Sequence, residues 1–237
     1  MRFFTICMFC LSVALLMSCE TLDLNKLLLL QNNNKLSENK IIAGLKQALE
    51  NGVTSATDKL SEKNGFFNNK SYKIQTPKNI KPVTDTMRKI GLGSLVDSFD
   101  EKMNSAAEKA TASAGPVFIE AIMEMNFQDA KKILYGKNTE ATEYLKKHTY
   151  KKLLAKYKPI ISKSIKEVGA GQIYSNLMDK YDALPFKSKP KFSLENYVAE
   201  KSLDAIFDEI AIEEQRIRTD PKARTTELLK EVFKHLE

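Results

Sequence analysis

The stretch SLENYVAEKSLDAIFDEIAIEEQRI, residues 193–217, indicates the fold more directly than any other part of the chain. Its large apolar side chains recur at steps of three and four residues, at Leu194, Tyr197, Val198, Ile206, Phe207, Ile210 and Ile217. That spacing places them along one face of an α-helix. Ser193 directly precedes the pattern and is a residue type that caps helices. We therefore predict one long amphipathic helix that begins after Ser193.

The same spacing recurs along most of the chain. It runs from Ile41 to Leu60 after a cap at Ser37, with a stop expected near Gly65, and it returns in further segments as far as a terminal helix that begins at Asp220-Pro221. Gly and Pro are few and fall between the apolar runs, and no segment alternates with a period of two. We predict an all-α protein, with one compact helical domain of about eight to ten helices over residues 38–237.

Three features interrupt the helical pattern. Residues 65–77 are rich in Phe and Asn and too short for a helix, so we expect a non-helical segment whose Phe side chains plug the helical body. Asn126, followed three residues later by Asp129, resembles a capping arrangement and predicts a new helix over residues 127–134. Pro159 lies inside an apolar pattern and should kink or divide its helix.

The beginning of the chain has the pattern of a secretory leader. Arg2 supplies a positive charge, Phe3–Leu16 is almost wholly apolar, and small Ser18 precedes Cys19. The apolar run is shorter than the roughly 20 residues of a membrane-spanning helix, which favours a signal peptide. Residues 16–19 resemble the lipobox of bacterial lipoproteins, in which a peptidase cleaves before a cysteine that carries a diacylglycerol. The resemblance implies a signal peptide over residues 1–18 and lipid on Cys19; an ordinary secretory signal or an uncleaved anchor is the alternative.

The cysteines and the residues after them fit this interpretation. Cys7 and Cys10 lie inside the expected leader, so Cys19 is the single thiol left in the mature chain. A disulfide scaffold and a cysteine metal cluster are thereby excluded. Residues 19–37 combine a short apolar patch, Leu27–Leu30, with the polar run Gln31–Asn34 and show no periodicity. We expect a lipidated N-terminus and a tether there.

Recognisable motifs for catalysis or cofactor binding are not found. The only histidines, His148 and His235, are far apart, and no H-E-x-x-H occurs, so we expect no metal site. Gly91-Leu92-Gly93 lacks the third glycine and the preceding strand of a phosphate-binding loop, and no G-x-S-x-G marks a serine nucleophile. We expect no cofactor and favour a protein that is not an enzyme. A hydrolase is not excluded, but no motif supports it.

Two groups of polar residues are the candidates for a ligand site. Asn104 and Glu108 lie four residues apart beside an apolar stripe, and Glu214, Arg218 and Arg224 gather near the end of the chain. If all five converge, they form a polar cleft between the C-terminal helices and the 94–113 helix, as in a small-ligand-binding protein or a hydrolase. The alternative is a set of ion pairs that fixes the turn after the long C-terminal helix.

Lysines dominate residues 146–166, where no carboxylate occurs. The chain has a formal net charge of +7 and a pI of about 9.1, which suits anionic partners. Four lysines are candidate contacts to anionic lipid or glycan: Lys146, Lys147, Lys151 and Lys152. Near an anionic membrane each lysine contributes ~1 kcal/mol. The alternatives are pairing with the acidic helix after Ser193, which also carries Lys201, Asp204 and Asp208, and a solvated face without a partner.

Several short motifs are shared with one protein family. They are Gly65-Phe66 with Asn68, Leu92-Gly93, Met103-Asn104 with Ala106-Ala107-Glu108, Asp129-Ala130, Ala141-Thr142, and, most specifically, Glu213-Glu214, Ile217-Arg218 and Ala223-Arg224-Thr225. On these residues, from about Ile41 to Phe233, the chain resembles an uncharacterised bacterial lipoprotein family, domain of unknown function 4197 (DUF4197). The resemblance implies a secreted, usually lipid-anchored body in bacteria with two membranes, and it carries over no catalytic residue.

The resemblance also bears on location. Glu20 stands where an aspartate retains many lipoproteins at the inner membrane, which implies the outer membrane, facing the periplasm. We therefore expect a lipid-anchored envelope protein that acts as a non-enzymatic binding or structural module. Its expected partners are the membrane, through Cys19, and an envelope protein or an anionic lipid or glycan. Nucleic acid is not an expected partner.

Overall fold

The structure is a computed structural model that describes residues 36–236. The expected signal peptide, Cys19 and nearly all of the expected tether lie outside the described residues. The chain divides into two units, Met1–Ser37 and Glu38–Glu237. The elements of the second unit are, in order, α2 (Glu38–Ser61), α3 (Lys81–Lys89), α4 (Gly93–Thr111), α5 (Gly115–Met123), α6 (Ala130–Leu134), α7 (Glu140–Glu167), α8 (Ala170–Asp182), α9 (Leu194–Thr219), η1 (Pro221–Ala223), α10 (Glu227–Phe233) and η2 (Lys234–Leu236).

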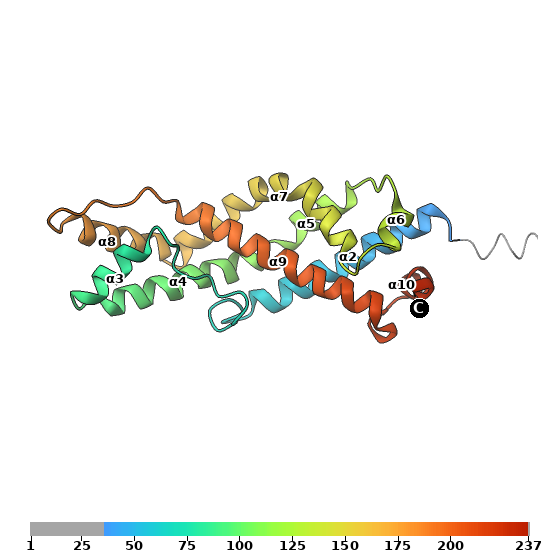
Figure 1. The fold of residues 1–237 in the computed structure, drawn as a ribbon, viewed down its shortest axis with the longest axis horizontal. Coiled ribbons are helices and arrows are strands. Elements are labelled where there is room, and N and C mark those ends of the chain that lie inside the picture. The colour runs from blue at the N-terminus through green and yellow to red at the C-terminus, as the bar shows by residue number, and fades with distance from the viewer. Residues whose placement is uncertain (1–35, 237) are drawn as a thin grey trace, which may run out of the picture. The chain divides into compact units, whose positions relative to one another are not determined.

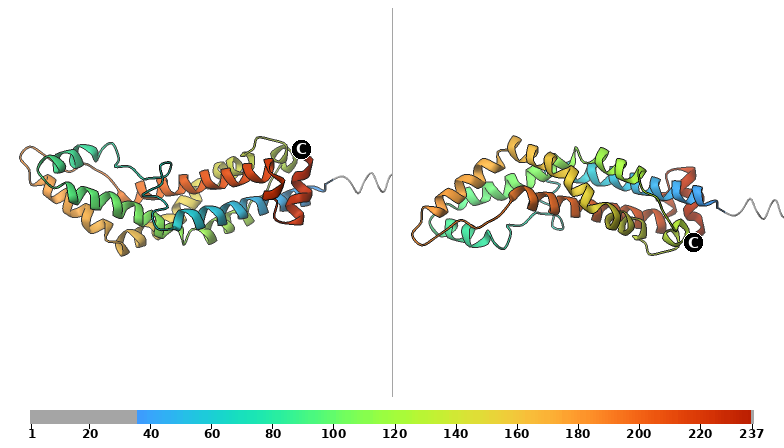
Figure 2. Two further views of the ribbon diagram at one scale, coloured as in Figure 1. Left: turned by 90° about the horizontal axis from the view of Figure 1, so that it is seen from below. Right: turned by 90° about the horizontal axis from the view of Figure 1, so that it is seen from above.

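The second unit is built from helices, and no strand occurs among residues 36–236, which confirms the predicted all-α class (Figure 1). Helix α9 is central, because it contacts α2, α7 and α4 (Figures 1 and 2). Its predicted apolar face packs inward: the buried members are Leu194, Val198, Ile206, Phe207, Ile210 and Ile217. Ser193 caps the helix as predicted, since its hydroxyl accepts a hydrogen bond from the backbone N–H of Asn196 at 3.2 Å.

Helices α2 and α9 approach closely because a glycine lies between them. A Cβ atom added to Gly52 would stand 3.2 Å from the Cα atom of Ile210, so any larger residue at Gly52 would push against the backbone of α9. The apolar face predicted for α2, from Ile41 to Leu60, is buried alongside it. Burial of such side chains is the main favourable contribution to folding, about 1.5–3 kcal/mol for each large one.

The segment between α2 and α3 is irregular, as expected for residues 65–77. Phe66 is fully buried and Ile74 nearly so, whereas Phe67 is only partly buried. The aromatic side chain of Phe66 therefore plugs the helical body. The second half of this segment, residues 71–75, runs beside α9.

Helix α6 begins later than predicted. Asp129, not Asn126, is the cap: its Oδ1 accepts a hydrogen bond from the backbone N–H of Lys132 at 3.0 Å, and the helix starts at Ala130. Phe127 stands before the helix, because its side chain is buried in the core. The backbone carbonyl of Asn126 instead accepts a hydrogen bond from the hydroxyl of Tyr144 at 2.8 Å.

Helix α7 continues through Pro159 and is not divided. Figure 1 shows α7 as one uninterrupted ribbon that arches near its label. A proline removes one helical hydrogen bond and crowds the preceding turn, which accounts for a bend. The turns on both sides keep buried apolar residues, Leu153 before the proline and Ile161 after it, so packing against α9 and α4 holds the helix together. It ends before Gly169, whose φ of 75° is left-handed.

The C-terminal segment differs from the single terminal helix predicted after Asp220. The side chain of Asp220 caps only the short turn η1, through the backbone N–H of Lys222 at 2.9 Å. Arg224 then leaves the helical conformation, and a second cap, Thr226, starts α10 by accepting from the backbone N–H of Leu229 at 3.2 Å. The break exists because the side chain of Arg224 is buried against the end of α9.

Candidate functional site

Glu214 is fully buried and holds the start of α7. Its carboxylate accepts hydrogen bonds from the backbone N–H of Ala141 at 2.9 Å, the backbone N–H of Thr142 at 2.7 Å and the hydroxyl of Thr142 at 2.6 Å. The first N–H groups of a helix have no partner inside the helix, and a negative charge there is favourable. Glu214 thus acts as a cap supplied by a distant part of the chain.

Arg218 lies beside Glu214 and closes the end of α6. Its Nε donates to Glu214 at 2.8 Å, and its two Nη atoms donate to the carbonyls of Leu134 at 2.5 Å and Ile133 at 3.0 Å. Arg224 does the same for the end of α9: its Nε donates to the carbonyl of Ile217 at 3.0 Å. Both guanidinium groups therefore hold helix ends together.

Asn104 and Glu108 bind the irregular segment before α3. The side chain of Asn104 accepts from the backbone N–H of Ile74 at 2.8 Å and donates to its carbonyl at 3.0 Å. Glu108 accepts from the backbone N–H groups of Phe66 at 3.1 Å and Phe67 at 3.2 Å. Two side chains of α4 thus provide the hydrogen-bond partners that regular secondary structure would otherwise give to the backbone of this segment.

The five predicted polar residues do not form the open cleft that a ligand site would require. They fall into two groups, one on α4 and one at the end of α9, and each is at least 92% buried. All buried side-chain nitrogen and oxygen atoms in the described part of the chain have a hydrogen-bond partner. The predicted cleft between the C-terminal helices and the 94–113 helix is therefore wrong. Arg224 borders a separate hollow, of about 600 Å³, beside η1 and α10.

The four candidate lysines of α7 have different environments. Lys146 pairs with Asp204 of α9, with Nζ 3.0 Å from Oδ1, and Lys152 pairs with Glu124 just after α5. Lys147 and Lys151 are exposed, and neither pairs with a carboxylate among residues 36–236. Half of the run thus fastens α7 to its neighbours, and half faces solvent.

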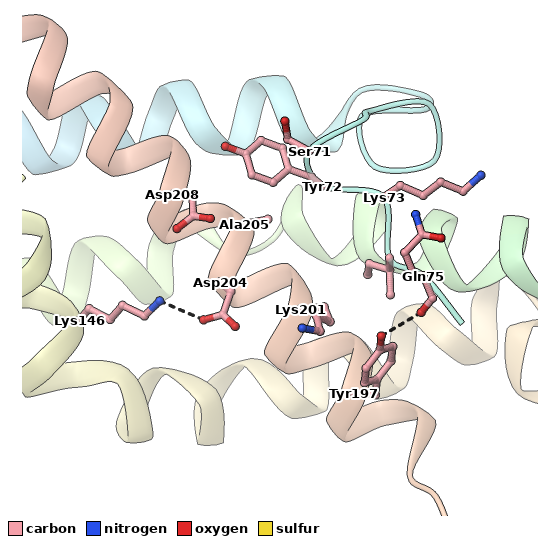
Figure 3. A pocket seen from close by; sticks show the side chains of 11 residues that line it. Ser71, Tyr72, Lys73, Gln75, Lys146, Tyr197, Lys201, Asp204, Ala205 and Asp208 are labelled. Atoms are coloured by element: carbon pink, nitrogen blue, oxygen red, sulfur yellow. Dashed lines mark hydrogen bonds and ion pairs between the residues drawn. The ribbon is translucent and has the colours of Figure 1, made fainter. Parts of the chain in front are cut away.

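A hollow between residues 71–75 and α9 is an accessible site where polar groups gather (Figure 3). Its volume is about 510 Å³, within the usual range for small-molecule sites. The charged and aromatic residues that line it include Tyr72, Lys146, Tyr197, Lys201, Asp204 and Asp208. Lys201, Asp204 and Asp208 share one face of α9, because they are spaced by three and four residues.

Two hydrogen-bonded contacts fix the walls of the hollow, and both are visible in Figure 3. The hydroxyl of Tyr197 donates to the backbone carbonyl of Gln75 at 2.9 Å, which ties α9 to the irregular segment. The Lys146–Asp204 pair ties α9 to α7 at the other side. Asp208 also lines the hollow, and no basic group of the described residues lies within ion-pairing distance of it.

The electrostatic environment of the hollow is set mainly by partial burial. Desolvation raises the pKa of Asp208, nearby Lys146 opposes that rise, and the carboxylates of Asp204 and Glu209 add to it. Desolvation also raises the pKa of Tyr72, and the adjacent Glu209 raises it further, so this phenol stays protonated and can donate a hydrogen bond. The hollow thus offers charged and hydrogen-bonding groups.

Lys201, Asp204 and Asp208 on the long C-terminal helix were not among the residues predicted to form a site. Their spacing on one face was the available signal. Tyr72 gave no signal, because it comes from a segment without periodicity that lies more than a hundred residues earlier in the chain. What makes these residues a site is the course of residues 71–75 beside α9.

Two general properties of the described residues complete the description. No cluster of three or more His, Cys, Asp or Glu side chains among residues 36–236 is arranged to hold a metal ion. No helix in that range combines the length and the apolar character that a membrane span needs.

Comparison with known proteins identifies one family. The family model described as a protein of unknown function (DUF4197) matches residues 35–234, nearly all of the helical unit. Searches of curated proteins and of solved structures found no match. The match agrees with the resemblance carried by the sequence motifs, and its description assigns no activity to the residues above.

Proposed function

The chain belongs to the DUF4197 family, and we propose that it is a lipid-anchored protein of the bacterial envelope that binds a ligand or partner without transforming it. The observation that carries this proposal is the leader sequence: a positive charge, a short apolar run and a small residue directly before Cys19. Two or more acyl chains at one cysteine give stable membrane attachment.

The order of the chain fits an anchored body. The first described helix, α2, begins at Glu38, so residues 20–37 separate the expected lipid from the folded unit. On the same reasoning, Glu20 after Cys19 supports the outer membrane, with the body facing the periplasm. Cys19 and Glu20 thus support the membrane as a partner and the periplasm as the compartment of the helical unit.

A binding role is supported by where the polar groups are. The polar residues predicted as a possible site, Glu108 and Glu214 among them, form hydrogen bonds to helix ends and to an irregular segment. The accessible polar groups at the hollow, by contrast, include Asp208 and Lys201, which pair with no charged residue of the described part. Groups of this kind bind complementary charges.

The exposed lysines support a second contact. Lys147 and Lys151 lie four residues apart on one face of α7, and we propose that they meet an anionic envelope component, lipid headgroup or glycan. Like charges at this spacing repel each other weakly, and an anionic partner relieves the repulsion.

The anchor is tested by replacing its cysteine. In bacteria grown with a labelled fatty acid, the unmodified chain should carry label and sediment with the outer membrane. Cys19→Ala should lose the label and leave the membrane fraction. Cys10→Ala, inside the leader, is the matched control and should keep both properties. Equal labelling of Cys19→Ala and the unmodified chain would refute the anchor.

A further inference from the structure

The hollow beside α9 retains one negative charge at one end. Of the three carboxylates near each other on this helix, Asp204 is paired with Lys146 at 3.0 Å. Glu209 is paired with Lys59 of α2 at 2.6 Å. Asp208, between them in the sequence, has no such partner among residues 36–236. A cationic group entering the hollow would therefore find Asp208 available.

The positive charge of Lys201 lies at the other end of the hollow; Lys73 also lines the hollow, but its side chain points away in Figure 3, with its Nζ 4.0 Å from the centre of the Phe67 ring. Lys201 pairs with no carboxylate among the residues that the structure describes, and its Nζ lies 5.9 Å from the centre of the Tyr197 ring. That ring is fixed by the hydrogen bond from its hydroxyl to the carbonyl of Gln75. An anionic group would therefore find Lys201 available, on a wall that the fold already holds in place.

The axial separation of the two charged residues follows from their places on one helix. Positions 201 and 208 are seven residues apart, or about two turns, which corresponds to about 10.5 Å along the axis. Figure 3 shows Tyr72 on the Asp208 side of the hollow and Tyr197 on the Lys201 side. Each charged end thus has an aromatic ring near it, and the ring of Tyr72 can attract a cation that is bound to Asp208.

We propose that this hollow binds a linear zwitterion of about tripeptide length, with its ammonium group on Asp208 and its carboxylate on Lys201. An extended chain advances about 3.3–3.6 Å per residue, so three residues match the axial separation of positions 201 and 208. A volume of about 510 Å³ accommodates a molecule of that size. The inference deepens the proposed binding function and rests on it for its biological context.

Binding is measured by isothermal titration calorimetry on the full-length protein in detergent micelles. The probe is tri-L-alanine with free termini, compared with its N-acetylated form and its C-terminal amide. Loss of either terminal charge should weaken binding about tenfold or more, because each removes a contact between charged groups. If the free peptide does not bind at millimolar concentration, or if blocking its termini has no effect, the inference is wrong.

Variants assign each terminus to its residue. Asp208→Asn should weaken the free peptide about tenfold or more but leave the N-acetylated peptide unchanged, because that peptide has no ammonium to lose. Lys201→Gln should likewise weaken the free peptide about tenfold or more but leave the C-terminal amide unchanged, because the amide has no carboxylate to lose. Asp58→Asn and Lys63→Gln, which neutralise exposed residues of the same types elsewhere, are the matched controls and should bind normally. The assignment would be overturned if a substitution and the matching blocked terminus weakened binding additively, or if the control variants bound the free peptide more weakly.

Two further measurements distinguish a wrong ligand class from a misfolded variant and from a missing lipid anchor. Circular dichroism melts of Asp208→Asn and Lys201→Gln should match the unmodified protein, since neither side chain is part of the core. Fatty-acid labelling reports on the anchor independently of the peptide. Labelled protein that ignores the tripeptide would therefore refute the ligand class and leave the anchor standing.

Discussion

At the residue scale, Glu214 is the side chain on which most of the polar network depends. Its carboxylate satisfies the start of α7 and pairs with Arg218, which in turn closes the end of α6. A buried pair of this kind is not in itself a large source of stability, because both charges lose their hydration. Removal of one partner is costly, because the other charge then stays buried without compensation.

We therefore expect Glu214→Gln to lower the free energy of unfolding by about 3–5 kcal/mol. The measurement is urea denaturation followed by circular dichroism. Glu227→Gln is the matched control, because Glu227 lies in the same C-terminal region, its side chain is 89% exposed, and its ion pair within residues 36–236 is with Lys230. The control should change stability by less than ~1 kcal/mol. Similar losses in the two variants would contradict the role given to Glu214.

At the element scale, the irregular segment before α3 depends on α4 for its backbone partners. Glu108 serves Phe66 and Phe67, and Asn104 serves both backbone groups of Ile74. The segment then continues along the hollow, so its order determines where Tyr72 stands. The geometry of the hollow thus depends on residues that do not line it.

We expect Glu108→Ala to speed amide hydrogen exchange at Phe66 and Phe67, because both N–H groups lose their acceptor. Asn104→Ala should do the same at Ile74. Exchange is measured by mass spectrometry on fragments that cover residues 62–77, with α9 as an internal reference. Glu101→Ala, an exposed position on the same helix, should leave exchange unchanged. Unchanged protection in the first two variants would show that packing of Phe66 alone holds the segment.

The elements themselves were largely predictable from sequence, because an apolar repeat at three and four residues specifies a helix and its buried face. The cap at Ser193, the buried stripe of α9 and the plugging Phe66 were all predicted and are confirmed. Local competition between caps was harder to predict, as Asn126 and Asp129 show. Pro159 left two outcomes open, and only packing on both sides of it decided between them.

The site was less predictable, because periodicity identifies which face of a helix is buried but not what lies against the other faces. Glu214 and Arg218 were correctly singled out as an unusual polar pair, yet their other partners, at the start of α7 and the end of α6, are more than seventy residues away in the sequence. Tyr72 and Tyr197, which flank the hollow, are likewise brought together only by the tertiary fold. A pattern along one helix contains no information on such contacts.

At the scale of the whole molecule, the net charge of +7 is not spread evenly. Several lysines of α7 are used inside the fold: Lys146 binds Asp204, and Lys156 binds Glu120 of α5 at 2.5 Å. These pairs clamp α7 between α9 and α5. The charge left to face an external partner on this helix is therefore smaller than the sequence suggests, and it includes Lys147 and Lys151.

The proposed anionic contact can be tested in the absence of the proposed lipid anchor, which would otherwise dominate membrane binding. With Cys19→Ala as the background, the full chain should bind vesicles that contain phosphatidylglycerol more tightly than neutral ones, and added salt should weaken the binding. Neutralising Lys147 and Lys151 together to Gln should reduce the partition coefficient about thirtyfold, since each lysine near the surface contributes about 1 kcal/mol. Lys63→Gln with Lys70→Gln removes the same charge from another surface. An equal loss in that control would mean that net charge, and not this face of α7, carries the interaction.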